Sequence, residues 1–127
     1  MLELHIKGTA ALTVTDEVTA ATVGSGMLPV FATPSMIALI EKAAADSVAS
    51  GLEPGMTTVG TKLDIAHTAA TPVGMAVRAE TELAEIDGRR LVFTVRAFDE
   101  VGEIGSGIHE RFIVNAEKFL AKTNAKK

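Results

Sequence analysis

The spacing of apolar residues changes along the chain, and the first clear pattern is that of a helix. Apolar side chains recur three or four residues apart at Ile37, Ile40, Ala44 and Val48. Thr33 suits the N-cap, Pro34 suits the first helical position, and Gly51 suits the stop that follows the last turn. The pattern therefore predicts one long helix from Thr33 to about Ser50.

After a turn at Glu53–Gly55 the apolar period becomes two, which is typical of half-buried strands. In the first of these strands Val59, Leu63, Ile65 and His67 are expected to share one face. Alternation predicts four strands, at Thr57 to His67, Met75 to Leu83, Leu91 to Val95 and Ile104 to Val114. Asp87-Gly88 marks a hairpin between the second and the third.

A first strand near Ala10 to Val14 and a short terminal helix from Ala116 to Lys122, capped by Asn115, complete the order of elements. One strand, one long helix and four antiparallel strands predict a single α+β domain over residues 1–127. This is the order of the hot-dog fold, in which an antiparallel sheet wraps one long central helix.

Glu41 interrupts the apolar pattern of the helix, because it lies on the face that should meet the core. A carboxylate in that position lowers stability unless it is paired, hydrogen-bonded or used in chemistry. Leu39 shows the opposite mismatch, since it points toward the expected solvent face. A helix that is buried on most of its surface would explain Leu39.

Composition and charge narrow the classes of function. A net charge of -4 gives no electrostatic footprint for nucleic acid. The chain has no cysteine, which excludes disulfides and thiolate metal sites, and no stretch approaches the roughly 20 apolar residues of a membrane span. We see no signal-peptide pattern at the start and therefore expect a soluble, cytoplasmic protein with no membrane partner.

Three residues remain that could carry chemistry together: Thr33 at the helix start, Glu41 two turns later and His67 at the end of a strand. A helix N-terminus offers N–H groups to an oxyanion, and a carboxylate beside an imidazole can serve as base or nucleophile. Spacing alone leaves a second interpretation open, in which these are a capping threonine, a rim carboxylate and a core histidine. The other histidines, His5 and His109, are scattered and form no metal motif, so we expect no metal. His109 is expected on an outward face or at a dimer seam.

Several segments, in order, resemble the hot-dog thioesterases of the fluoroacetyl-CoA thioesterase group, over nearly the whole chain. They are Phe31-Ala32-Thr33-Pro34-Ser35-Met36, Glu41, Leu52-Glu53-Pro54-Gly55, Thr58-Val59-Gly60-Thr61, His67-Thr68-Ala69-Ala70-Thr71-Pro72, Gly88-Arg89-Arg90-Leu91-Val92-Phe93 and His109-Glu110-Arg111-Phe112.

The resemblance implies an acyl-CoA thioesterase with a catalytic set of Thr33, Glu41 and His67, no metal, and no cofactor other than the CoA of its substrate. Glu41 would act as general base on water or attack the thioester directly, and the resemblance does not separate these. Gly60 would let the thioester approach the backbone, and Arg111 would support the pocket rim or the interface. The resemblance also implies a homodimer whose sheets join edge to edge, with active sites at the subunit interface, and it leaves a tetramer open.

One departure concerns the substrate. Family members specialised for fluoroacetyl-CoA carry aromatic residues in the lid before the helix, whereas Val23-Gly24-Ser25-Gly26-Met27-Leu28 contains none. We therefore expect a broader short-chain or aryl acyl-CoA substrate rather than specificity for fluoroacetyl-CoA. A non-catalytic acyl-CoA-binding or regulatory hot-dog protein is the alternative. A hydratase is disfavoured, because the helix has no histidine beside Glu41.

Overall fold

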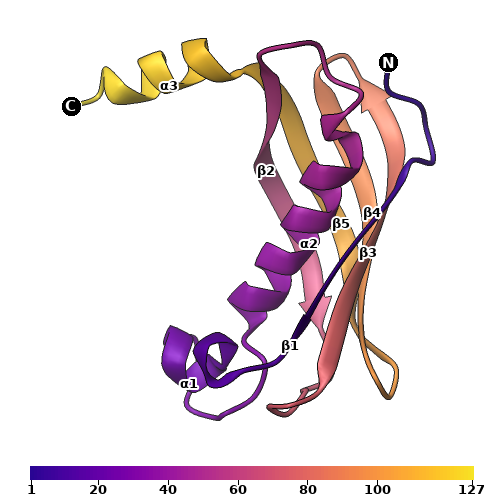
Figure 1. Cartoon of the computed structure of the whole chain (residues 1–127), viewed down its shortest axis with the longest axis vertical. Coiled ribbons are helices and arrows are strands. Elements are labelled where there is room, and N and C mark those ends of the chain that lie inside the picture. The colour runs from indigo at the N-terminus through magenta and orange to yellow at the C-terminus, as the bar shows by residue number, and fades with distance from the viewer.

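A five-stranded antiparallel sheet wraps the long helix α2 (Thr33–Ala49) in the computed structural model, which describes all 127 residues. The strands are β1 (Lys7–Thr13), β2 (Met56–His67), β3 (Ala76–Asp87), β4 (Arg90–Asp99) and β5 (Glu103–Asn115). Their order in the sheet is β1-β3-β4-β5-β2, so β1 and β2 are the two edges (Figure 1). The shorter elements are η1 (Asp16–Val18), α1 (Ala20–Val23) and α3 (Ala116–Asn124).

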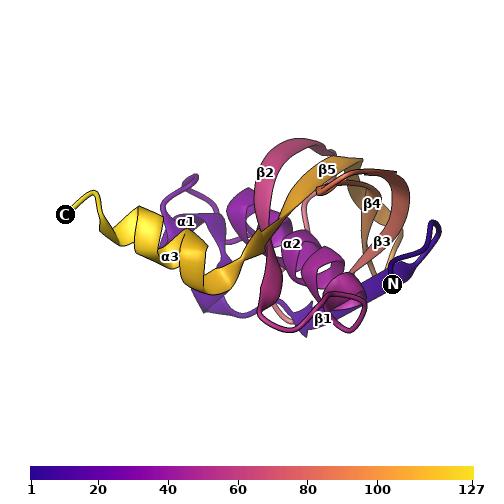
Figure 2. The same cartoon turned by 90° about the horizontal axis from the view of Figure 1, so that it is seen from above.

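Helix α2 lies in the concave face of the sheet, which curls around it when seen from above (Figure 2). Its buried residues are Met36, Leu39, Ile40, Ala43, Ala44 and Val48. They pack against inward-facing residues of β3, β4 and β5 such as Leu83, Phe93 and Ile104, in one apolar cluster. Leu39 is buried because the helix is covered on most of its circumference, as expected. This arrangement is the predicted hot-dog fold.

The N-terminus of α2 differs from the prediction in its cap. Thr33 is the first helical residue, Pro34 follows it, and Ala32 occupies the N-cap without a side-chain hydrogen bond. The predicted capping role of Thr33 is therefore wrong. Its hydroxyl is instead bonded to His67, which leaves the helix end without a side-chain cap.

Strand β2 also departs from simple alternation. A β-bulge lies between Gly60 and Lys62 in its pairing with β5. Because a bulge adds one residue to one strand, it exchanges the faces of the positions that precede it. Leu63 pairs with His109, which is buried on the inner face of β5. Val59 pairs with Phe112, which is exposed on the outer face. The expectation that Val59, Leu63 and Ile65 share one face is wrong for Val59.

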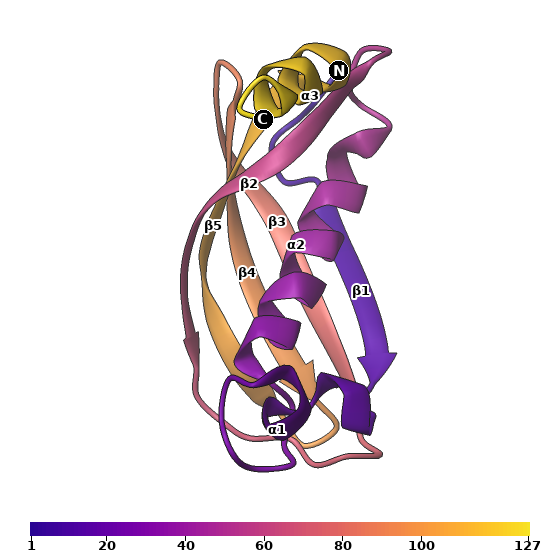
Figure 3. The same cartoon turned by 90° about the vertical axis from the view of Figure 1, so that its left-hand side faces the viewer.

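The two ends of α2 are covered differently. At its N-terminus lie η1, α1 and the loop that returns to the helix, held by isolated bridges from Thr19 to Phe31 and from Val30 to Pro72 (Figure 3). At the opposite end of the molecule α3 extends away from the sheet, past the β2 edge (Figures 1 and 2). None of the helices combines the length and the apolar run needed to cross a bilayer.

The packing of α2 can be tested at two neighbouring positions. Ile40 is fully buried, so Ile40→Ala should lower the free energy of unfolding by about 2–5 kcal/mol through lost contacts and a cavity. Lys42 is exposed on the same helix, and Lys42→Ala should change it by no more than about 0.5 kcal/mol. Urea denaturation measures both. Equal effects of the two variants would contradict the placement of the helix in the core.

Candidate active site

Thr33 and His67 meet where the first turn of α2 lies beside the end of β2. The Thr33 Oγ1 and His67 Nδ1 atoms are 2.7 Å apart, which is hydrogen-bonding distance. The two residues are 34 positions apart in sequence, so the sheet register and the helix start together create the pair. The structure thus brings two of the three expected catalytic residues together.

Burial shapes the chemistry of His67. It lowers the pKa of His67 below the ordinary value of 6.5, an effect that the nearby backbone of Ala69 partly offsets. The imidazole is therefore neutral near pH 7 and can accept or donate a proton. Its Nε2 atom is buried and has no hydrogen-bond partner in the chain. Because an unpaired buried nitrogen is costly, His67 is a candidate functional residue rather than a purely structural one.

A cavity of about 270 Å³ opens beside this pair. Five of its nine lining residues are apolar; the lining is Ala20, Ser25, Val30, Phe31, Thr33, His67, Thr68, Ala69 and Ala70. The backbone N–H groups of Thr33 and Ser35, in the first turn of α2, make no hydrogen bond to another backbone group. Such N–H groups at a helix N-terminus stabilise an anionic oxygen.

Glu41 lies farther along α2, above Gly60 of β2. Its Oε2 atom is 3.4 Å from Nη1 of Arg111, and its side chain is 37% exposed. A Cβ atom at position 60 would overlap with that same oxygen. Gly60 therefore makes room for the carboxylate of Glu41.

Arg111 is buried beneath Glu41 rather than placed at a rim of the chain's surface. Its Nε donates to the Thr58 hydroxyl at 2.8 Å, and its Nη2 donates to the Thr58 carbonyl at 3.0 Å. Burial lowers the pKa of Arg111, and the charge of Glu41 partly offsets this. The guanidinium is held on one side by Thr58, so it fixes the position of the carboxylate on the other side.

His109 completes this cluster, and its expected position on an outward face or a dimer seam is wrong. The side chain is 0% exposed and stacks on Phe93. Its Nδ1 donates to the Lys62 carbonyl at 2.8 Å, and its Nε2 accepts from Nη1 of Arg111 at 3.2 Å. The tautomer follows from the partners, because a carbonyl can only accept and a guanidinium can only donate. The spacing of two residues from Arg111 on one strand would have predicted this shared face.

One chain does not bring all three expected catalytic residues together. Eight residues of helix separate Thr33 from Glu41, which is about 12 Å along the axis. Seven residues of β2 separate His67 from Gly60, which is about 20 Å along the strand. The Thr33–His67 pair and the Glu41–Gly60–Arg111 cluster are therefore two separate half-sites, at different points along α2 and β2.

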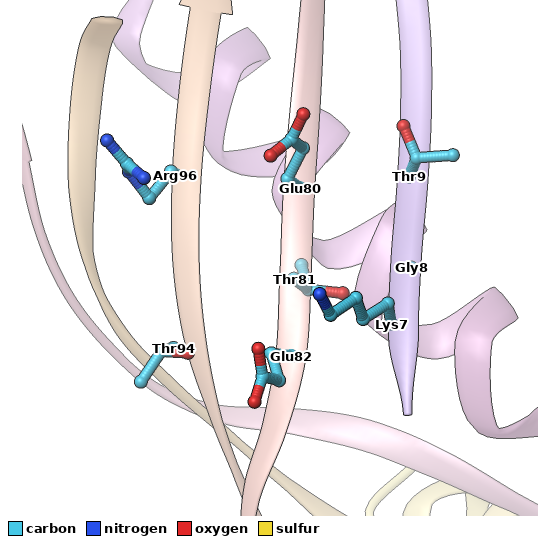
Figure 4. Close-up of a pocket in the computed structure, with 8 residues that line it drawn as sticks. All are labelled: Lys7, Gly8, Thr9, Glu80, Thr81, Glu82, Thr94 and Arg96. Atoms are coloured by element: carbon cyan, nitrogen blue, oxygen red, sulfur yellow. The ribbon is translucent and has the colours of Figure 1, made fainter. Parts of the chain in front are cut away.

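The largest hollow of the molecule lies elsewhere, on the face of β1, β3 and β4 that points away from α2 (Figure 4). Its volume is about 600 Å³, and none of its lining residues is hydrophobic. Lys7, Glu80 and Arg96 are among the side chains that surround it (Figure 4). It offers no apolar wall for an acyl group. No group of three or more His, Asp or Glu side chains in the structure is arranged to hold a metal ion.

The buried imidazole of His109 predicts a pH dependence of stability. Burial lowers the pKa of His109 below 6.5, and the charge of Arg111 adds to this, while Lys62, Glu41 and Glu110 act in the opposite sense. The unfolded chain then binds more protons than the folded one below pH 6.5, so stability is complete above that pH and is lost as the pH falls through the interval down to the folded pKa.

Urea denaturation between pH 7.5 and pH 5 should therefore show a declining free energy of unfolding, from about pH 6.5 downward. In His109→Gln the neutral amide cannot protonate, so the decline should be smaller, although the variant is less stable at pH 7.5. His5→Gln is the matched control, because His5 is exposed. A slope that His109→Gln leaves unchanged would contradict the assignment of this histidine as buried and neutral.

Comparisons with known proteins identify the family of the chain. The family model described as "FlK: Fluoroacetyl-CoA-specific thioesterase" matches residues 14–117. A fluoroacetyl-CoA thioesterase of Streptantibioticus cattleyicolor is 48% identical over 97 residues, which are 76% of this chain and 70% of that protein.

Solved structures of FlK are similar over the whole chain. One structure of this fluoroacetyl-CoA thioesterase is 38% identical, covers 100% of this chain and 98% of its own, and has a TM-score of 0.93. A point mutant of FlK in complex with acetyl-CoA is 37% identical, covers 99% of both chains and has a TM-score of 0.94. The hot-dog fold predicted from the sequence is thereby confirmed. The chain belongs to the FlK family of fluoroacetyl-CoA-specific thioesterases.

Proposed function

We propose that this thioester hydrolase cleaves short acyl-CoA thioesters at a site that two chains build together. The observation that carries the proposal is the Thr33–His67 hydrogen bond at the start of α2, beside a partly apolar cavity. The hydroxyl, the neutral imidazole and the N–H groups of the helix are suited to an acyl carbonyl. A carboxylate that could activate water is absent from this half-site, and Glu41 of the same chain lies two helical turns away.

A second copy of the chain would supply that carboxylate. Strand β2 is an edge of the sheet and has one row of unpaired backbone groups. When two identical edges pair across a two-fold axis, they run antiparallel. Pairing centred between Leu63 and Asp64 would set His67 of one chain opposite the partner's Gly60. The partner's Glu41, which rests on its own Gly60, would then face the Thr33–His67 pair.

An exposed apolar residue on β2 supports such a dimer. Leu63 is exposed at the edge although its cross-strand neighbour His109 is fully buried. The unpaired Nε2 of His67 also lies at the end of this edge strand. Pairing of two such edges would cover Leu63. A homodimer is therefore part of the proposal, as is a cytoplasmic location, which suits a chain without cysteine.

In the proposed reaction, the thioester carbonyl points toward the first turn of α2, where the Thr33 and Ser35 N–H groups stabilise the developing oxyanion. In one course Glu41 removes a proton from water, the hydroxide attacks the carbonyl carbon, and the carbon–sulfur bond breaks. In the other course Glu41 attacks the carbon itself and forms an anhydride that water then opens. In both, the CoA thiolate leaves and takes up a proton, and Thr33 and His67 hold and move protons beside the reacting carbon.

The lid before α2, residues Val23 to Leu28, should limit which acyl groups the site accepts. The exposed residues Val23, Met27 and Leu28 are its apolar side chains, and no aromatic residue lies between Val23 and Leu28. Flexible Met and Leu side chains adapt to more than one acyl shape. Fluoroacetyl-CoA, the substrate named for the relatives, should therefore be hydrolysed together with acetyl-CoA and other short acyl-CoA esters, with modest discrimination between them.

A panel of CoA esters tests this function. Fluoroacetyl-, acetyl-, butyryl-, benzoyl- and palmitoyl-CoA are incubated with the protein, and free CoA is measured with a colorimetric thiol reagent. Release of thiol from the short esters is the expected result. Tight binding of the esters without thiol release would favour the alternative, a non-catalytic acyl-CoA-binding protein.

Glu41 provides the sharpest substitution. Glu41→Gln keeps the shape of the side chain but removes its basicity, so turnover should fall by about 100- to 10,000-fold. The fold should persist, because Arg111 keeps its bonds to Thr58 and His109. Asp46→Asn, an exposed carboxylate on the same helix, is the control and should retain full activity. Near wild-type hydrolysis by Glu41→Gln would remove Glu41 from the mechanism.

A further inference from the structure

The C-terminal helix α3 is well specified but hardly packed. Its N-cap is made by Asn115, whose side chain accepts from the Lys118 N–H at 3.0 Å. None of its nine residues is buried, and Phe119 and Leu120 are 41% and 57% exposed. A helix of this length is marginal in water without tertiary packing. Its apolar side chains are therefore only partly covered within the chain.

The direction of α3 points to where that surface lies. The helix leaves the sheet at the end where β2 begins, since Met56 pairs with Asn115 and the Ala116 N–H donates to the Gly55 carbonyl. It then runs outward past the β2 edge (Figures 1 and 2). From that side of the molecule it is seen nearly end-on (Figure 3). The space it enters is the space that the second copy occupies in the proposed dimer.

The two-fold pairing of β2 fixes which part of the second copy lies there. Antiparallel pairing places the start of β2 of one chain beside the end of β2 of its partner. In each chain the end of β2 carries His67, the Thr33 pair and the lid segment, which we define as Val23–Leu28. In this dimer, helix α3 of one chain therefore lies beside the lid segment of the other. Within one chain α3 and α1 are at opposite ends (Figure 1).

The two surfaces are complementary in polarity and charge. Met27, at 91% exposure, and Leu28 present apolar area on the lid segment, as Phe119 and Leu120 do on α3. The end of α3 and the residues after it carry Lys122, Lys126 and Lys127, whereas η1 beside the lid carries the exposed acidic residues Asp16 and Glu17. Apolar contact would be flanked by opposite charges, which is the pattern of a specific interface.

We propose that α3 of each subunit packs on the lid segment of its partner, so that Phe119 and Leu120 cover Met27 and Leu28 and close the acyl cavity in trans. The inference rests on the proposed dimer and adds a role for the C-terminal helix. Since the lid segment has no aromatic residue of its own, Phe119 would supply the aromatic part of the cover. The occupant of this surface is thus a second copy of the chain.

Cross-linking tests the contact. Because the chain has no native cysteine, the reagent reacts only with the introduced thiols. The double variant Met27→Cys/Phe119→Cys is treated with a short bismaleimide and run on a reducing denaturing gel. A covalent dimer is expected, because the two positions are too far apart to be linked within one chain. Met27→Cys/Lys118→Cys is the matched control, since Lys118 is turned about 100° around α3 from Phe119, away from the Phe119–Leu120 face, and should give less product.

The mass of the wild-type protein in solution distinguishes a failure of the α3 contact from a failure of the proposed dimer. A dimeric protein that gives equal cross-linking in the two double variants, or none in either, overturns the α3 contact but leaves the proposed dimer intact. A monomeric wild-type protein overturns both.

Activity gives a second readout. Phe119→Ala should lower kcat/KM for short acyl-CoA esters about tenfold with the dimer retained, as expected for losing part of a buried aromatic contact. Lys118→Ala should leave kcat/KM unchanged, and an unchanged value in Phe119→Ala contradicts a cover over the acyl cavity.

Discussion

The rigid spacing between Thr33 and Glu41 is the constraint on which this account depends. Both residues are on one helix, and two turns of a buried α-helix do not bend to bring its ends together. The sheet that encloses α2 keeps the two sites apart on β2 as well, with Gly60 next to Glu41 and His67 next to Thr33. A single chain therefore carries two half-sites, and a two-fold axis at the β2 edge is the simplest operation that joins unlike halves.

Each half-site is prepared by its own chain. Arg111, held by Thr58 and His109, gives Glu41 a fixed cationic neighbour. Burial keeps His67 neutral beside Thr33, at a helix start that has no side-chain cap. Preorganisation of this kind means that little has to move when substrate arrives. The long contact that the dimer requires along β2 would also account for the outward course of α3.

Much of the fold could be predicted from the sequence, because periodicity reports which face of an element is buried. The helix from Thr33 ends within one residue of its predicted end, and every predicted strand is present, although each is longer than predicted. Two errors had local causes. The bulge after Gly60 changes the face of Val59, and in this strand the apolar residues keep an alternating spacing across it. Thr33 resembles a cap, yet His67 takes its hydroxyl, and only the folded register brings these two residues together. The buried position of His109 was missed, although Arg111 two residues later indicated its face.

The central claim is that Glu41 of one chain acts with Thr33 and His67 of another, and subunit complementation tests it most directly. Glu41→Gln and His67→Ala, each inactive alone, are mixed under conditions that exchange subunits. If half of the dimers are mixed and one of the two sites in each is intact, the mixture should recover about a quarter of wild-type activity. The contradicting result is a mixture that is fully dimeric and has exchanged its subunits, yet is no more active than the two separate variants. That result would place the chemistry within one chain.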